Sequence, residues 1–209
     1  MKKIVVAFVS IFALIGMSIA IAQSDPVAVL RSVADQMIAS LKKNKTTLKT
    51  NPGLVYSLAG RYIVPHADLT EMSKRVLPPK TWNSATSAQR SAFQKEFTTT
   101  LIRTYASAIA QYKDQTVDFF PIHGGYAGKS AVTVESQINS QDGPPISVTY
   151  RMISTGGGWK LYDLNVEGVS MLESFRSQFS DQLSHSNMAD LIQVLKRHNH
   201  DNEQADANS

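Results

Sequence analysis

Asp163 has the surroundings that an acid–base residue would need. It lies in the run 159–164, whose alternating side chains indicate a strand, beside Tyr162 and Tyr150. Burial raises the pKa of a carboxyl group and would suit it for proton transfer. The alternative, which we favour, is that Asp163 caps the following turn or pairs with Arg151.

The histidines and serines are weaker candidates for chemistry. His123 precedes two glycines, which indicates a loop histidine in a turn. His198 and His200 could bind a metal weakly, but we expect a solvated pair in a polar tail. No serine lies in a G-x-S-x-G sequence. We therefore predict no catalytic residue, no metal site and no cofactor.

The N-terminus predicts secretion. Lys2 and Lys3 precede the apolar stretch 4–21, and Ala20-Ile21-Ala22 is a small-x-small cleavage site, so residues 1–22 are expected to form a cleaved signal peptide. An uncleaved membrane anchor is the alternative. The chain has no cysteine, which excludes a lipoprotein attachment site and disulfides. These features favour the periplasm of a Gram-negative bacterium.

The composition excludes a nucleic-acid-binding protein. The 209 residues carry a formal net charge of +4, and loss of Lys2 and Lys3 with the signal peptide lowers it to +2. No run rich in lysine and arginine is interleaved with aromatic residues. Residues 23–198 suffice for one domain with a substantial core, and the sequence shows no internal repeat.

The first half of the mature chain, 25–112, has helical patterns. Asp25-Pro26 predicts a helix start, and Lys42, Lys43 and Lys45 lie at the expected end of that helix, where cations are favourable. We interpret this cluster as a solvated helix end, with docking to lipid or to a partner as the alternative. Short helices are expected at 52–60 and 68–76, the second stopped by Pro78-Pro79.

A long helix follows. Thr86 and Gln89 form a capping box. Apolar and aromatic residues then recur about every four positions: Phe93, Phe97, Leu101, Tyr105, Ile109 and Tyr112. Such a slanted stripe indicates helix core or one wall of an elongated cavity.

From residue 116 to residue 165 the period changes to two, which predicts an antiparallel meander of four strands. Strict alternation along the last strand places Trp159, Leu161 and Asp163 on one face and Lys160, Tyr162 and Leu164 on the other. A capping box at Ser170 and Glu173 opens closing helices over 170–198, the last of them capped by Asn187. The polar tail 199–209 is expected to be disordered.

Two ordered sets of residues stand out. The first is a tryptophan followed by a Thr-capped aromatic helix: Trp82, Thr86, Gln89-Arg90, Phe93, Phe97 and Tyr105. The second combines W-K-x-Y-D-x-x-x-E-G-V-S, over 159–170, with R-x-x-F, over 176–179. Together they resemble the MlaC family of periplasmic phospholipid carriers, also called toluene-tolerance auxiliary proteins. The resemblance extends from about Pro26 to Leu195. This chain differs in its polar C-terminal extension and in the loose turn Gly156-Gly157-Gly158.

The resemblance implies an α+β fold, in which a helical part packs with a curved antiparallel sheet of the nuclear-transport-factor type around an apolar pocket. It implies a soluble carrier of glycerophospholipid and no catalytic residues. It also implies two partners, an inner-membrane ABC transport complex and an outer-membrane lipoprotein–porin complex, between which lipid is carried to maintain outer-membrane asymmetry. We expect a monomer.

The expected pocket walls are residues that the strand and helix periodicities place on inward faces, taken together with the resemblance. They are Phe97, Leu101, Tyr105, Val132, Val134, Val148, Tyr150, Trp159, Leu161, Val169, Met171, Leu172 and Phe175. Tyr105, Tyr150 and Tyr162 combine an apolar ring with a polar tip, which suits a pocket mouth as well as a core boundary. Three alternatives stay open: an acid–base enzyme at Asp163, a non-catalytic interaction protein with a filled core, and a carrier of another apolar cargo.

Overall fold

The computed structural model describes residues 24–51, 53–141 and 143–207, so the expected signal peptide lies outside the described residues. The chain has the expected α+β architecture. Its helical part comprises α1 Pro26–Lys43, α2 Lys45–Thr50, α3 Leu54–Tyr62, the 3-10 turn η1 Val64–His66, α4 Leu69–Val76, α5 Pro79–Ser84 and α6 Ser87–Ala110. The sheet and closing helices comprise β1 Thr116–Phe119, β2 Ala131–Asn139, β3 Ile146–Thr155, β4 Gly158–Val166, β5 Val169–Ser170, α7 Met171–Ser184 and α8 Met188–Ala207.

Side-chain caps fix where several helices begin. The Asp25 carboxylate accepts from the Val27 amide at 2.9 Å, which starts α1. Thr86 and Gln89 cap each other reciprocally, at 2.9 and 3.2 Å, so the predicted capping box of α6 is confirmed. Ser170 caps the N-terminus of α7, as the sequence predicted.

Proline placement explains a helix that the sequence reading missed. Pro78-Pro79 ends α4, as expected, but Pro79 then begins α5, because proline suits the first turn of a helix. This short helix buries Trp82 at 6% exposure. The long helix α6 ends at Ala110, just before Tyr112.

The sheet is an antiparallel meander in the order β1-β2-β3-β4-β5. Four strands were predicted, and the fifth, β5, has two residues that pair with the end of β4. The reversal between them is tight because Glu167 and Gly168 adopt φ angles of 51° and 84°. Gly168 takes this left-handed conformation without a Cβ penalty.

A β-bulge changes the phase of β4. Met152 pairs with Leu161, whereas its neighbour Arg151 pairs with Asp163, so the register shifts between them. Residues directly opposite each other share a face, so Leu161 and Asp163 lie on opposite faces. The strict alternation expected for this strand is therefore wrong beyond Leu161.

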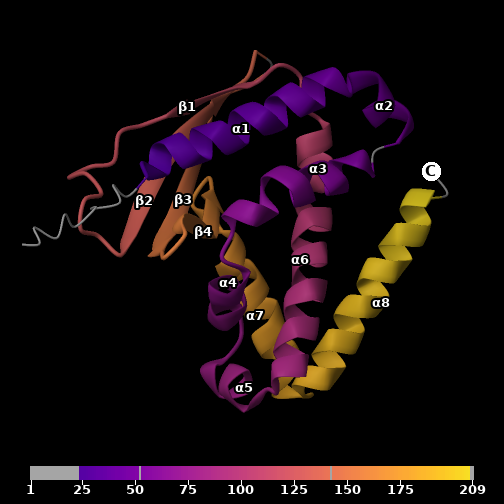
Figure 1. Ribbon diagram of the computed structural model, residues 1–209. Helices are drawn as coiled ribbons and strands as arrows, with labels where there is room; N and C mark the ends of the chain where they lie inside the picture. Colours follow the sequence, from indigo (N-terminus) through magenta and orange to yellow (C-terminus); the bar gives the residue numbers. More distant parts are fainter. Residues whose placement is uncertain (1–23, 52, 142, 208–209) are drawn as a thin grey trace, which may run out of the picture.

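Figure 1 shows α1 lying across the sheet, with α6, α7 and α8 extending away from the sheet as a separate bundle. Buried apolar side chains form three clusters among the described residues. The helical cluster contains residues of the five helices α4, α5, α6, α7 and α8 and is centred on Phe93, Phe97 and Phe179. The α1–sheet cluster contains Leu30 and Trp159. The third cluster joins α1, α3 and the end of α6, and comprises Met37, Leu41, Val55, Leu58 and Ala106.

The C-terminal segment contradicts the expected disorder. Helix α8 continues to Ala207, and its residue Asn199 is buried at 6% exposure. The Asn199 amide accepts from Thr100 and donates to the Glu96 carbonyl, both at 3.0 Å. Because both the oxygen and the nitrogen of this buried amide are hydrogen-bonded, Asn199 anchors this part of α8 on α6. The low hydrophobicity of the tail gave no sign of this contact.

Candidate functional site

One face of the sheet, which we call the α1 face, is mostly apolar. Cross-strand register assigns thirteen side chains of the three long strands to it. They are Val132, Val134, Ser136, Ile138, Ile146, Val148, Tyr150, Met152, Ser154, Trp159, Leu161, Leu164 and Val166.

Helix α1 fills one end of this face. Leu30 packs there in one buried cluster with Val134, Met152 and Trp159. Met152 is fully buried and Trp159 is 2% exposed. The Trp159 Nε1 has no hydrogen-bond partner among the described residues. This end of the face is therefore closed core with one unpaired donor.

The other end of the face remains open. Six apolar residues there belong to none of the three clusters formed by the described residues, and we call them the open apolar patch: Ile138, Ile146, Val148, Leu164, Val166 and Val169. Their exposure rises from 4% at Val148 to 40% at Ile146 and 62% at Val169. Exposed apolar side chains gathered in this way mark a surface that binds something apolar.

A neutral pair of polar groups adjoins the buried end of the patch. Ser136, 2% exposed, donates from its hydroxyl to the Tyr150 hydroxyl at 3.1 Å. Burial raises the pKa of Tyr150. An uncharged hydroxyl pair next to hydrocarbon can bond to ester or phosphate oxygens without the cost of burying a charge.

The structure distributes the residues expected in the pocket over different environments. Phe97, Leu101, Leu172 and Phe175 lie in the helical cluster, with Tyr105 and Met171 half-buried against it. Val132, Val134 and Trp159, with Tyr150, belong to the α1–sheet cluster. Val148 and Val169 lie in the open apolar patch, and the backbone of Leu161 bridges to Ala67 and accepts from the Asp68 amide at 2.8 Å.

The sequence reading did not select four residues of the patch: Ile138, Ile146, Leu164 and Val166. Ile138 and Ile146 lie opposite each other, and alternation within their own strands already places them in phase with Val134 and Val148. Leu164 and Val166 reach this face only because of the bulge. Alternation within single strands does not contain that information.

Asp163 is held by hydrogen bonds and an ion pair with neighbouring residues, as the favoured interpretation predicted. Its carboxylate is 3.5 Å from the Arg151 guanidinium and accepts from the Ser170 hydroxyl at 2.8 Å and from the Leu172 amide at 3.2 Å. It thereby ties the start of α7 to the sheet, where a carboxylate also favours the helix dipole. Burial, and then the negative charge of Asp163, raise the pKa of Tyr105.

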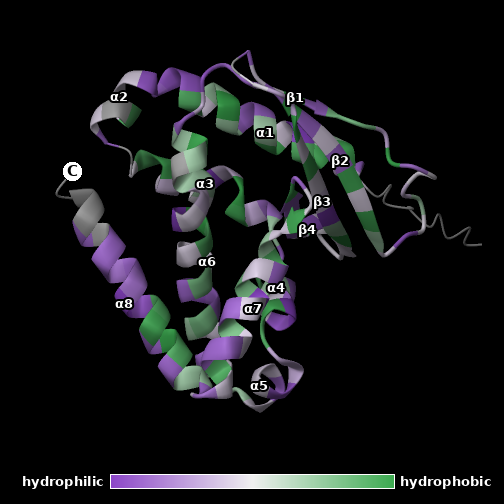
Figure 2. Cartoon of the chain, turned by 180° about the vertical axis from the view of Figure 1, so that it is seen from behind, coloured by the Kyte–Doolittle hydropathy of each residue, from purple (hydrophilic) through white to green (hydrophobic). Residues whose placement is uncertain are grey.

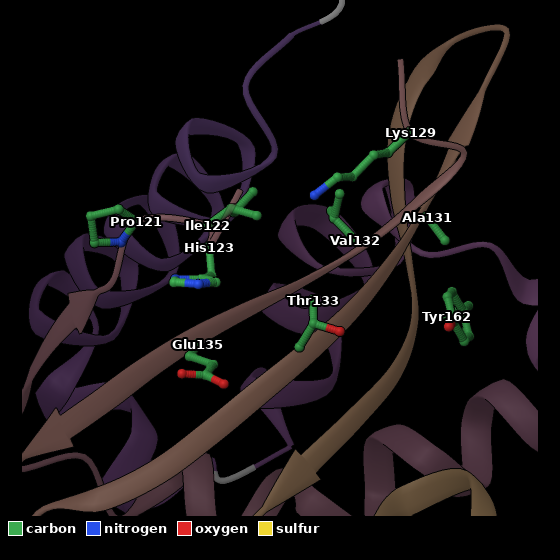
Figure 3. Close-up of a pocket in the computed structure, with 9 residues that line it drawn as sticks. All are labelled: Pro121, Ile122, His123, Lys129, Ala131, Val132, Thr133, Glu135 and Tyr162. Carbon is green, nitrogen blue, oxygen red and sulfur yellow. The ribbon is translucent and has the colours of Figure 1, made fainter. Parts of the chain in front are cut away.

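A polar hollow lies on the opposite face of the sheet (Figure 3). It has a volume of about 350 Å³ and is lined by Pro121, Ile122, His123, Lys129, Ala131, Val132, Thr133, Glu135 and Tyr162. The close-up shows His123 and Glu135 on one side, from the β1–β2 connection and from β2. His123, Lys129 and Glu135 are all exposed, so water screens their charges. Its lining mixes these polar side chains with apolar ones such as Ile122 and Val132, unlike the more continuous apolar surface of the α1 face.

In the part of the chain that the structure describes, no group of three or more His, Cys, Asp or Glu side chains is placed to hold a metal ion. None of the helices in this part combines the length and the hydropathy that a membrane span needs.

Comparisons with known proteins agree on one family. The sequence profile described as MlaC protein matches residues 31–197. The chain is 29% identical over 163 residues to the toluene tolerance protein ttg2D of Pseudomonas putida, covering 78% of this chain and 75% of that protein. It is 26% identical over 157 residues to the intermembrane phospholipid transport system binding protein MlaC of Haemophilus influenzae, covering 74% and 72%.

A solved structure shares the fold. It is that of a phospholipid-binding protein from Ralstonia solanacearum in complex with a phospholipid. The two chains superpose with a TM-score of 0.78 at 31% identity, over 85% of this chain and 98% of the other.

Proposed function

This chain belongs to the MlaC protein family, and from that premise we propose that it is a non-catalytic periplasmic carrier of glycerophospholipid. The observation that carries the proposal is its likeness, over 85% of its length, to a protein solved with a phospholipid bound. Its relatives include a binding protein of an intermembrane phospholipid transport system, which is the same class of activity.

The open apolar patch gives the proposal a physical basis. A phospholipid with two long chains has roughly 30 methylenes, and exposing each to water costs about 0.8 kcal/mol, so leaving a bilayer costs on the order of 20 kcal/mol. A carrier must offset most of that with apolar contacts. Aliphatic side chains such as Val148, Leu164 and Val166 supply contacts that tolerate chains of different length.

We propose that the patch and its neighbours on the α1 face contact the acyl chains, with Tyr150 near the polar part of the lipid. The walls expected from sequence remain part of this proposal: Phe97, Leu101, Tyr105, Val132, Val134, Val148, Tyr150, Trp159, Leu161, Val169, Met171, Leu172 and Phe175. Those in the helical cluster would back the site, because their neighbours already surround them.

As a carrier, the protein would act as a monomer after removal of residues 1–22. It would exchange lipid with an inner-membrane ABC transport complex and an outer-membrane lipoprotein–porin complex, and so maintain outer-membrane asymmetry. Asp163 would be structural, because Arg151, Ser170 and Leu172 already occupy its oxygens.

Native mass spectrometry of protein secreted to the periplasm and purified without detergent tests the proposal. We expect an added mass equal to that of a diacyl phospholipid, which organic extraction then identifies. A protein that is empty and takes no lipid from vesicles would refute the carrier and favour an interaction protein. A different extracted apolar molecule would refute phospholipid as the cargo.

A further inference from the structure

The end of the molecule formed by α2, α3 and the adjoining ends of α1 and α6 has an unusual charge distribution. The sequence contains no Asp or Glu between Asp35 and Asp68, and none in 97–113. These two acid-free stretches meet in space, because α1, α2, α3 and the end of α6 pack together. Figure 1 shows them converging at one corner of the molecule.

We call this corner the basic end. Most of its lysine and arginine side chains are exposed to solvent. Lys42, Lys43 and Arg61 are exposed. Lys45 is 3.8 Å from Asp114, but both side chains are more than 60% exposed, at 64% and 61%. Arg103 lies 4.8 Å from the ring centre of Tyr56. The helix end predicted from Lys42 and Lys43 is thus one part of a larger positive surface.

Half-buried tyrosines lie among these cations. Tyr56, Tyr62 and Tyr112 pack against the buried cluster of α1, α3 and α6. Hydrogen bonds from Ser40 and Arg61, and then the charges of Arg61 and Lys43, lower the pKa of Tyr62. The smaller part of that shift comes from the two cations, which places them close to the Tyr62 hydroxyl. Tyrosine and basic residues together are the composition that favours the interface of a membrane with water.

We propose that the basic end docks the protein on an anionic phospholipid bilayer. Lysine and arginine side chains would approach lipid phosphates while the tyrosine rings lie at the level of the head groups. The interaction would be reversible and salt-sensitive, since exposed charges are screened over about 8 Å at physiological ionic strength. The basic end shares no residue with the open apolar patch, so docking and lipid binding can be tested with different variants.

Vesicle co-sedimentation of the mature chain tests this docking. The probes are vesicles of phosphatidylcholine alone and of phosphatidylcholine with phosphatidylglycerol, in low and in high salt. The test variant carries Lys42→Glu, Lys43→Glu and Arg61→Glu. The matched control carries Lys74→Glu, Lys80→Glu and Lys95→Glu, which makes the same change of net charge at exposed lysines on α4, α5 and α6.

We expect the parent to bind anionic vesicles in low salt, with little binding to neutral ones. Each basic residue near an anionic surface contributes roughly fivefold to affinity, so the test variant should lose about a hundredfold. The control variant should lose far less. Equal losses in the two variants, equal binding to neutral vesicles, or no binding by the parent would each overturn the proposal.

Two further measurements keep the result interpretable. Reversing Lys42 and Lys43 removes cations from the last turn of α1, so thermal unfolding must show that the variant is folded. If it is not, Lys42→Gln with Arg61→Gln replaces it, and unchanged vesicle binding by that folded variant overturns the proposal. Phospholipid extracted from the purified test variant should match the parent, which separates a docking defect from a binding defect.

Discussion

The helical cluster and the α1 face of the sheet are both rich in apolar residues, yet they are packed differently. In the helical cluster, Phe93, Phe97, Phe175 and Phe179 form a connected set of rings with centroids 5.4 to 5.7 Å apart. Each of these rings is at most 6% exposed. On the α1 face, Met152 is fully buried whereas Ile146 is 40% exposed.

This difference separates stability from binding. Interlocked rings leave no room for a ligand and make the helical bundle a rigid support. The open end of the sheet lacks such partners, so its apolar surface is available to hydrocarbon. Figure 2 shows that hydropathy alone does not make the distinction, because hydrophobic residues mark both the bundle and the strands.

The largest expected contrast is in large-to-small substitutions. Phe97→Ala should lower the free energy of unfolding by about 3–5 kcal/mol, because Phe97 is 1% exposed and contacts three other rings. Ile146→Ala, its control in the patch, should cost within about 0.5 kcal/mol. Urea unfolding measures both, and similar losses would remove the proposed contrast.

Asp163 joins the two regions, and its removal should have the next largest effect. Asp163→Ala leaves the Leu172 amide without its acceptor and should cost about 2–3 kcal/mol. Asp163→Asn keeps an acceptor oxygen and should cost less, with lipid transfer largely retained. Complete loss of transfer by a folded Asp163→Asn variant would instead support a catalytic Asp163.

Small-to-large substitutions test which region can accommodate a larger side chain without loss of stability. Leu101→Trp adds volume within the helical cluster and should cost about 1–3 kcal/mol. Ile146→Trp enlarges a side chain of the open patch that is 40% exposed, so stability should stay closer to that of the parent while bound phospholipid falls. Comparable destabilisation by the two variants, or unchanged lipid in the Ile146 variant, would contradict this assignment.

The smallest effect concerns the Tyr150 hydroxyl. Because burial raises its folded-state pKa above 10.0, its contribution to stability is complete below that pH and is lost as the pH rises through the folded value. Tyr150→Phe should cost about 1 kcal/mol at neutral pH by removing the Ser136 bond. Tyr150→Phe should also weaken the expected loss of stability at alkaline pH, which urea unfolding measures. An unchanged loss would mean that other groups cause it.

Local signals in the sequence predicted the elements well. Capping pairs such as Thr86 with Gln89 placed helix starts, because a cap involves residues three positions apart. Features that depend on distant residues were missed. The bulge opposite Arg151 moved Asp163 to the other face, and the anchoring of Asn199 on α6 extended α8. Leu164 and Val166 likewise join the open apolar patch only through the bulged pairing of β3 with β4.

The two tryptophans provide the most direct test, because each reports on one of the compared regions. Trp159 belongs to the α1–sheet cluster and Trp82 to the helical cluster. The variants Trp82→Phe and Trp159→Phe, loaded with phospholipid brominated along its acyl chains, isolate the fluorescence of each. We predict measurable quenching of Trp159, which shares the α1 face with the open apolar patch, and less quenching of Trp82. Equal quenching, or stronger quenching of Trp82, would contradict the claim that the sheet holds the lipid.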